Sequence, residues 1–322
     1  MDEYERGERR ADLDGLSLEA AVDAVADGSS ESGTVRETLA VVADDGVVRR
    51  AAVDDALANA SKVVTTAETR AELAAAALDD ARDAAEPVAD LDVVAARLEG
   101  FAARLETVED RAAGLGDRLQ SIVDRKRDGD LYELAREIRQ MTAAATEVQR
   151  AADDLAFDLE SFDAWLDEPD RRAGDLADDI DALERSLDEL EDVVDGLGSE
   201  ASDLEDVADG ETDPAVTWAQ AAIQRRVTEL LLADLRAELA TLREWAGREG
   251  ADPPSDVEPR LDELAARRER LGERLADRTE PPWRERFGDR VAAIDEALDE
   301  FEPPVDWVAV EAVVEEHRPD GG

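Results

Sequence analysis

The sequence predicts an all-α protein, with a small N-terminal helical bundle, a long antiparallel coiled-coil hairpin and further helices. Apolar residues recur in alternating steps of three and four over long stretches, which is the seam pattern of coiled-coil helices. Prolines such as Pro87, Pro169 and Pro214 stand between these stretches, where helices begin or end. We therefore divide the chain into residues 1–88 (the bundle), residues 89–168 (the hairpin) and residues 169–322 (a C-terminal helical region).

The clearest seams lie between Leu91 and Leu166. The first runs through Leu91, Val94, Leu98, Phe101, Leu105, Val108, Ala112, Leu115, Leu119 and Ile122, and the second through Leu131, Leu134, Ile138, Met141, Ala145, Val148, Ala152, Leu155, Leu159, Phe162 and Leu166. Residues 127–130, Arg-Asp-Gly-Asp, separate them, and so short a connection favours antiparallel neighbours. Asp130 is placed to cap the second helix, with Glu133 completing a capping box.

The first 88 residues predict shorter helices, rich in alanine and valine. Capping residues and turns give their bounds: Ser17 caps a helix to about Ala26, Thr34 caps one to about Ala43, residues 44–46 form a turn, a helix starts near Arg50, and Thr65 caps another that ends at Pro87. We expect these helices to pack as a bundle.

The C-terminal region predicts five more helices. A third seam runs from Leu176 to Leu197, and Asp213-Pro214 is a strong helix start because Asp caps and Pro suits the first helical position. The helix after it ends at Gly250. The next begins with a cap at Ser255, and Pro281-Pro282 and Pro303-Pro304 bound the last two.

Charge is the most unusual property of the composition. The chain has 85 acidic and 37 basic residues, a formal net charge of −48, and only Lys62 and Lys126 of the basic residues are lysines. So large a charge repels itself unless salt screens it, and molar salt shortens the screening length to about 3 Å. Acidic, lysine-poor and rich in alanine and valine, the composition is typical of a protein from the cytoplasm of an extreme halophile.

The sequence contains no constellation that predicts an enzyme. There is no cysteine, and His317 is the single histidine, so cysteine nucleophiles, thiolate metal sites and a serine–histidine pair are not expected. No phosphate-binding loop or dinucleotide fingerprint occurs. We predict no catalytic, cofactor-binding or metal site and no cofactor. No apolar run is long enough for a membrane span, and residues 1–11 lack a signal-peptide core, so we expect a cytoplasmic protein without membrane insertion.

Two sets of residues are candidate contact sites. Arg125, Lys126 and Arg127 form a basic cluster at the predicted hairpin turn, and they are our candidate partner contact. The alternative is that they stabilise a helix C-terminus, where cations are favoured. Five tryptophans lie near predicted helix ends, where they either close the ends of bundles or form an aromatic cage for a ligand: Trp165, Trp218, Trp245, Trp283 and Trp307. The arginine-dense segment 260–290 is interleaved with acids and predicts a surface laced with ion pairs.

Several helical stretches resemble a haloarchaeal family of uncharacterised coiled-coil proteins called halo transducer proteins. They start at Gly15 (GLSLEAAV), Val35 (VRETL), Asp45 (DGVV), Ala60 (ASKVV), Val88 (VADLDVV), Leu131 (LYELAR) and Gln149 (QRAADDL), and the match covers about the first 200 residues. The resemblance implies a haloarchaeal source. The membrane spans and the glutamine- and alanine-rich tip of chemotaxis transducers do not occur in this sequence.

These observations favour a non-enzymatic scaffold or signalling adaptor that binds other proteins, with homo-oligomers left open. The alternative is a chromosome-associated or helix-turn-helix DNA-binding protein that uses residues 35–63, with residues 44–46 joining its two helices. The second of those helices carries Arg49, Arg50 and Lys62 with Asp54 and Asp55 between them. Phosphate contacts need more positive charge than this, so nucleic acid is the less favoured partner.

Overall fold

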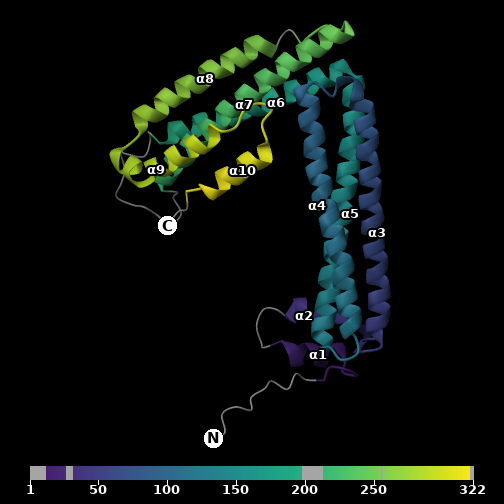
Figure 1. Ribbon diagram of the computed structural model, residues 1–322. Helices are drawn as coiled ribbons and strands as arrows, with labels where there is room; N and C mark the ends of the chain where they lie inside the picture. Colours follow the sequence, from purple (N-terminus) through teal and green to yellow (C-terminus); the bar gives the residue numbers. More distant parts are fainter. Residues whose placement is uncertain (1–11, 27–31, 198–212, 255–256, 320–322) are drawn as a thin grey trace. The chain divides into compact units, whose positions relative to one another are not determined.

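The computed structural model describes residues 12–26, 32–197, 213–254 and 257–319 (Figure 1). Within these ranges it contains ten α-helices, one 3₁₀ turn (Glu86–Val88) and a two-stranded sheet, so the predicted all-α class is confirmed. The chain forms two compact units, residues 1–84 with 98–162 and residues 85–97 with 163–322. In the described part of the chain, no helix is both long and apolar enough to span a membrane.

Helix α3 (Ala52–Ala85) is one continuous element. The predicted break before a helix capped by Thr65 is therefore wrong. Alanine-rich sequence without glycine or proline favours an uninterrupted helix. The hydroxyl groups of Thr66 and Thr69 donate to carbonyls four residues earlier, at 2.9 Å each, so these threonines are satisfied inside the helix and do not cap a new one.

Helices α4 (Asp92–Arg125) and α5 (Leu131–Asp167) run in opposite directions in the first unit. Arg104 pairs with Asp158 at 2.7 Å and Arg125 with Glu137 at 2.6 Å, and the partner numbers add to 262 in both pairs, as they must for antiparallel neighbours. The backbone N–H of Glu133 donates to Asp130 at 3.0 Å, so the predicted cap of α5 is confirmed.

Helix α3 packs beside α5 and runs in the same direction (Figure 1). The side-chain amide of Gln149 donates to the carbonyl of Val63 at 2.8 Å, and Arg70 pairs with Asp153 at 3.0 Å. The partner numbers differ by 86 and by 83, so a residue of α3 lies level with the residue about 84 positions later in α5. Helices α3 and α5 contribute buried small and apolar side chains to the core: Ala60, Val64, Ala67, Ala74, Leu78, Leu134, Ile138, Met141 and Leu155.

The N-terminal elements are α1 (Leu18–Val25), α2 (Ser32–Ala40) and strands β1 (Ala43–Asp44) and β2 (Val47–Val48). Ser17 caps α1 as predicted, but α2 begins before Thr34 and ends before Ala43, so the predicted bounds of that helix are wrong. The strands were not predicted. Asp45 and Gly46 both have positive φ, at 50° and 76°, and this pair of angles closes a two-residue β-hairpin.

The second unit contains α6 (Pro169–Gly196), α7 (Pro214–Glu249), α8 (Val257–Arg278), α9 (Pro281–Leu298) and α10 (Trp307–Glu316). Asp213 caps α7 through the N–H of Ala215, and Gly250 ends that helix with φ 72°, both as predicted. The predicted cap at Ser255 and the segment 198–212 lie outside the described residues. Buried leucines and isoleucines of α6, α7, α8 and α9, with Val310 of α10, form the interior of this unit.

Arginines of α8 bind acids of α6 along the length of both helices. Arg267 pairs with Glu191 at 2.5 Å, and Arg274 pairs with the same carboxylate at 2.6 Å. Arg260, seven residues before Arg267, pairs with Glu184. A spacing of seven residues returns the side chain to the same side of the helix, so the predicted surface laced with ion pairs is confirmed for α8.

Candidate functional site

The predicted basic cluster lies at the turn between α4 and α5, and two of its three residues are bound within the chain. Arg125 forms a two-pronged ion pair with Glu137, at 2.6 and 3.2 Å, which raises its pKa. The ammonium group of Lys126 lies 2.7 Å from Asp54 of α3. Arg127 is exposed, and within the described ranges no ion pair is recorded for it. The turn therefore presents much less free positive charge than the sequence indicates.

The same turn is held by the N-terminal segment. The guanidinium group of Arg50 donates to the carbonyls of Gly129, at 2.9 Å, and Lys126, at 3.3 Å, while the backbone N–H of Arg50 donates to Asp14 at 2.8 Å. The α4–α5 turn is therefore in contact with α3 and with the segment just before it. A Cβ atom on Gly129 would lie 2.8 Å from the carbonyl oxygen of Arg125, so the tightness of the turn requires glycine there.

Reversing the charge of Lys126 should destabilise the first unit more than reversing that of Arg127. Lys126→Glu puts a carboxylate beside Asp54, whereas Arg127→Glu breaks no ion pair with any residue that the structure describes. We expect a difference of about 0.5–1 kcal/mol in the free energy of unfolding, the range for exposed ion pairs. Chemical denaturation of both variants at one salt concentration measures it, and equal losses would show that the pair with Asp54 contributes nothing.

The helix-turn-helix geometry is not present at residues 44–46. The expectation that this turn joins two helices is wrong, because the turn is the tip of the β1–β2 hairpin. Arg50, one of the basic residues assigned to phosphate contacts, is engaged by the carbonyls of the α4–α5 turn. The segment 35–63 therefore offers a nucleic-acid backbone even less charge than its sequence predicts.

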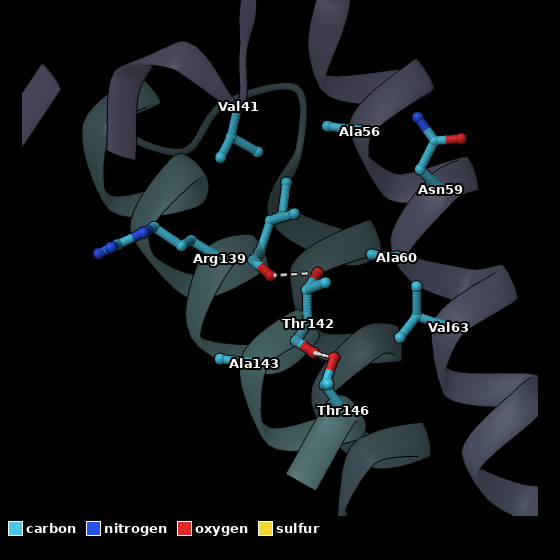
Figure 2. A pocket seen from close by; sticks show the side chains of 10 residues that line it. Val41, Ala56, Asn59, Ala60, Val63, Arg139, Thr142, Ala143 and Thr146 are labelled. Atoms are coloured by element: carbon cyan, nitrogen blue, oxygen red, sulfur yellow. Dashed lines mark hydrogen bonds between the residues drawn. The ribbon is translucent and has the colours of Figure 1, made fainter. Parts of the chain in front are cut away.

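A shallow groove of about 440 Å³ lies between α3 and α5 (Figure 2). Apart from Arg139 its walls are mostly short side chains, and Val41 also lines it: Ala56, Asn59, Ala60 and Val63 of α3, and Ile138, Arg139, Thr142, Ala143 and Thr146 of α5. The hydroxyl groups of Thr142 and Thr146 donate to carbonyls of their own helix, at 2.8 and 2.9 Å. Their protons are therefore already used and are not available to a ligand in the groove. The groove is apolar and suits a side chain better than a polar small molecule.

Two large apolar side chains stand exposed further along the same two helices. Leu73 of α3 is 56% exposed and Phe157 of α5 is 67% exposed. Leu73 is two heptads beyond Asn59, and Phe157 is two heptads beyond Ala143, so each shares the heptad position of a groove residue. The groove and the two exposed side chains thus belong to one surface, which we call the α3–α5 face.

The second unit holds a charged pocket of about 290 Å³ around Arg97. Arg97 pairs with Glu238 at 3.3 Å and with Asp175 at 3.7 Å, and its guanidinium group lies 4.1 Å from the ring centre of Trp165. Asp234 accepts from the backbone N–H of Val305 at 3.0 Å and from the indole N–H of Trp307 at 2.8 Å, which anchors the segment before α10. Among the described residues, no group of three or more acids and histidines has a geometry that would hold a metal ion.

Burial in this pocket raises the pKa of Glu238, and the neighbouring Asp179 and Asp234 raise it further, while Arg97 opposes the change. The side chain of Glu238 is only 15% exposed, so its charged form loses most of its hydration. Burial likewise raises the pKa of Asp179. The single positive charge of Arg97 is therefore too small to neutralise the carboxylates of Glu238, Asp179 and Asp234 together.

Glu238→Gln should raise the free energy of unfolding of the second unit at pH 7, because it removes a charge that the folded state disfavours. The folded chain binds a proton at Glu238 more tightly than the unfolded chain, whose glutamates titrate near ~4.3. Wild-type stability therefore falls as the pH rises from the unfolded-state pKa through the raised one. The advantage of the variant should shrink as the pH is lowered through that window. Melting curves of both proteins across this range test it; a variant that melts lower at pH 7 would show that the pair with Arg97 outweighs the burial.

Trp165, Trp218 and Trp245 are buried against the chain's own residues and do not form an open cage. Trp165 and Trp245, both 1% exposed, meet edge to face with ring centres 5.3 Å apart. Their faces are occupied by the chain's own arginines, since Arg172 lies 3.8 Å from the Trp245 ring centre and Arg97 covers Trp165. Trp218 is buried and donates to Thr279 at 2.8 Å. A cationic ligand would have to displace these guanidinium groups.

The α3–α5 face was missed in the sequence. The signal was present in Phe157, which stands two positions from each of the seam residues Leu155 and Leu159, where the other off-seam positions up to Phe162 are polar or alanine. An apolar side chain at an outward heptad position indicates a contact beyond the helix pair. For Leu73, the wrong division of α3 into two helices hid the heptad relation to Asn59.

No known protein-family model, curated protein or solved structure matches this chain.

Proposed function

We propose that this chain is a non-enzymatic coiled-coil scaffold or adaptor that acts through a protein contact on the α3–α5 face. The observation that carries the proposal is the pair of exposed side chains, Leu73 and Phe157, in line with an apolar groove on the same two helices. A coiled-coil pair of α4 and α5, supported by α3, provides a long and stiff platform for such a face. Large exposed apolar side chains that lie together mark interaction sites.

The charge of the face supports a protein partner. Arg70, Arg139 and Arg150 stand on it with Asp153, Asp154 and Glu160, a balance of zero, whereas the whole chain carries −48. Most of the molecular surface repels other acidic proteins, and this face does not. A polyanion such as DNA would need many more cations than three arginines, two of which pair with acids of the same chain, Asp153 and Glu37.

The basic turn is a secondary contact in this proposal. Arg127 is exposed and forms no ion pair with the described residues of the chain, so we take it as the residue of the turn that is available to a partner. Arg125 and Lys126 would first have to leave Glu137 and Asp54.

The test is affinity capture from a lysate kept at about 3 M KCl, where the charge is screened. The double variant Leu73→Ser/Phe157→Ser should lose the proteins that the wild-type chain retains. Val308→Ser is the matched control, because Val308 is 79% exposed and lies in the second unit. Both variants should stay folded at this salt concentration, since the altered side chains are exposed. If the double variant and the control retain the same proteins as the wild type, the proposal is wrong.

A further inference from the structure

We infer that the partner on the α3–α5 face is a second copy of this chain, docked antiparallel about a two-fold axis level with Thr66 and Arg150. The inference rests on the proposed function, because it takes this face to be a protein contact. The face carries a protrusion, the exposed side chains of Leu73 and Phe157, and a hollow, the apolar groove. The two are complementary, so a second copy of the same face can fill the groove.

The protrusion and the hollow lie at equal distances from one point. Leu73 is seven residues beyond Thr66 on α3, and the groove residue Asn59 is seven residues before it. On α5, Phe157 is seven residues beyond Arg150, and the groove residue Ala143 is seven residues before it. Seven residues of helix span about 10.5 Å, so protrusion and hollow are about 21 Å apart.

The two midpoints lie at one level of the molecule. Thr66 and Arg150 are 84 positions apart, between the offsets of 86 and 83 that the contacts Val63–Gln149 and Arg70–Asp153 give. Consider a two-fold axis at this level that lies in the plane of the interface and runs perpendicular to both helices. It brings the face of one copy against the same face of the other. It places Leu73 of each copy over Asn59 of the other, and Phe157 over Ala143, so that each protrusion enters a groove.

The charges of α5 fit the same axis. Arg139, Thr146, Asp153 and Glu160 share one heptad position along the middle of the face. The axis puts Arg139 of one copy opposite Glu160 of the other, and Thr146 opposite Asp153, so opposite charges meet at both ends of the interface. The two copies of Arg150 meet at the axis itself, where Asp153 and Asp154 of the facing helix lie within about one turn.

The face is large enough for a stable dimer. From Ala56 to Ala77 it is about 32 Å long, and two helices are about 20 Å wide. Each copy would bury roughly 640 Å², or about 1,300 Å² in total, which lies within the standard range for specific complexes. The exposed phenylalanine of each copy would contribute a central aromatic anchor, the kind of residue that dominates binding energy.

Disulfide formation by single cysteines tests the geometry, because the natural chain has none. In Thr66→Cys, the two thiols of the dimer face each other across the axis, within the short range that a disulfide requires. Thr65→Cys is the matched control: it is the neighbouring exposed threonine, about 100° further round the helix and off the face. Under mild oxidation of the purified chains at about 3 M KCl, Thr66→Cys should yield about 100-fold more covalent dimer than Thr65→Cys, the gain expected from a preformed contact.

Sedimentation of the wild-type chain at the same salt concentration should give the mass of two chains, and Leu73→Ser/Phe157→Ser should give the mass of one. A wild-type chain that sediments as a monomer overturns the inference, as does equal cross-linking of the two cysteine variants. Failure here is distinct from failure of the proposed function: a monomeric chain whose captured proteins still depend on Leu73 and Phe157 would bind a different partner on the same face.

Discussion

Lowering KCl from about 4 M to about 0.1 M should unfold this protein at room temperature or bring its melting temperature close to it. Even if each of the 37 basic residues neutralised one acid, 48 carboxylates would remain. At about 0.1 M salt the screening length is about 10 Å, so neighbouring carboxylates on the same helix repel one another, whereas at molar salt it falls to about 3 Å. The compact state brings these charges together and the unfolded chain separates them, so removing salt favours unfolding.

Circular dichroism at the helix minimum, recorded on melting at a series of KCl concentrations, measures this effect. Melting temperature should rise steadily with salt. The ion pairs of α6 with α8 act in the opposite sense, because salt weakens exposed pairs, but each contributes at most about 1 kcal/mol. A melting temperature that stays constant between about 0.1 M and 4 M would contradict the expectation drawn from the composition.

Arg172→Ala should cost the second unit about 3 kcal/mol of unfolding free energy, more than any other single change considered. The Arg172 side chain is only 4% exposed. It donates to the carbonyls of Leu166, at 2.7 Å, and Trp165, at 3.4 Å, which are among the last carbonyls of α5. It also forms an ion pair with Glu249 at the end of α7 and covers the ring of Trp245. One guanidinium group thus ties together the ends of two helices and a buried aromatic pair.

Removing this group leaves buried carbonyls without a donor and a partly buried carboxylate without its cation. Arg172→Lys should recover part of the loss, because an ammonium group keeps the charge but cannot reach the carbonyls, the carboxylate and the ring together. Arg171→Ala is the matched control, since Arg171 is exposed. Chemical denaturation at one salt concentration measures all three variants. A loss from Arg172→Ala no larger than that of Arg171→Ala would show that Arg172 has no structural role.

Most helix positions followed from sequence because apolar periodicity reports which side of a helix is buried. The seams of α4, α5 and α6 and the starts of α1, α5 and α7 were predicted from that periodicity and from capping residues. The continuity of α3 was not, because Thr65-x-x-Glu68 has the composition of a capping box and only the absence of a helix breaker argues against one. The β1–β2 hairpin is too short to show the alternation that identifies strands.

The candidate site depended on pairing between distant segments, which sequence periodicity does not determine. That Asp54 and Arg50 reach the α4–α5 turn follows from the packing of α3 alongside α5, a contact between residues about 84 positions apart. Without that packing, Lys126 has the appearance of a free surface cation. For the same reason the groove between α3 and α5 was not foreseen, although most of its residues are visible in the sequence as small side chains.

The most direct test of the α3–α5 face is the reactivity of a thiol placed in its groove. Asn59→Cys, at the exposed edge of the groove, should react with a maleimide several-fold more slowly in a lysate at about 3 M KCl than the same cysteine combined with Leu73→Ser/Phe157→Ser, because a partner's side chain covers it only when the face is intact. Thr65→Cys, exposed on α3 but off the face, should react at the same rate with and without the two serine substitutions. Equal rates for Asn59→Cys with and without Leu73→Ser/Phe157→Ser would contradict the claim that this face is a protein contact.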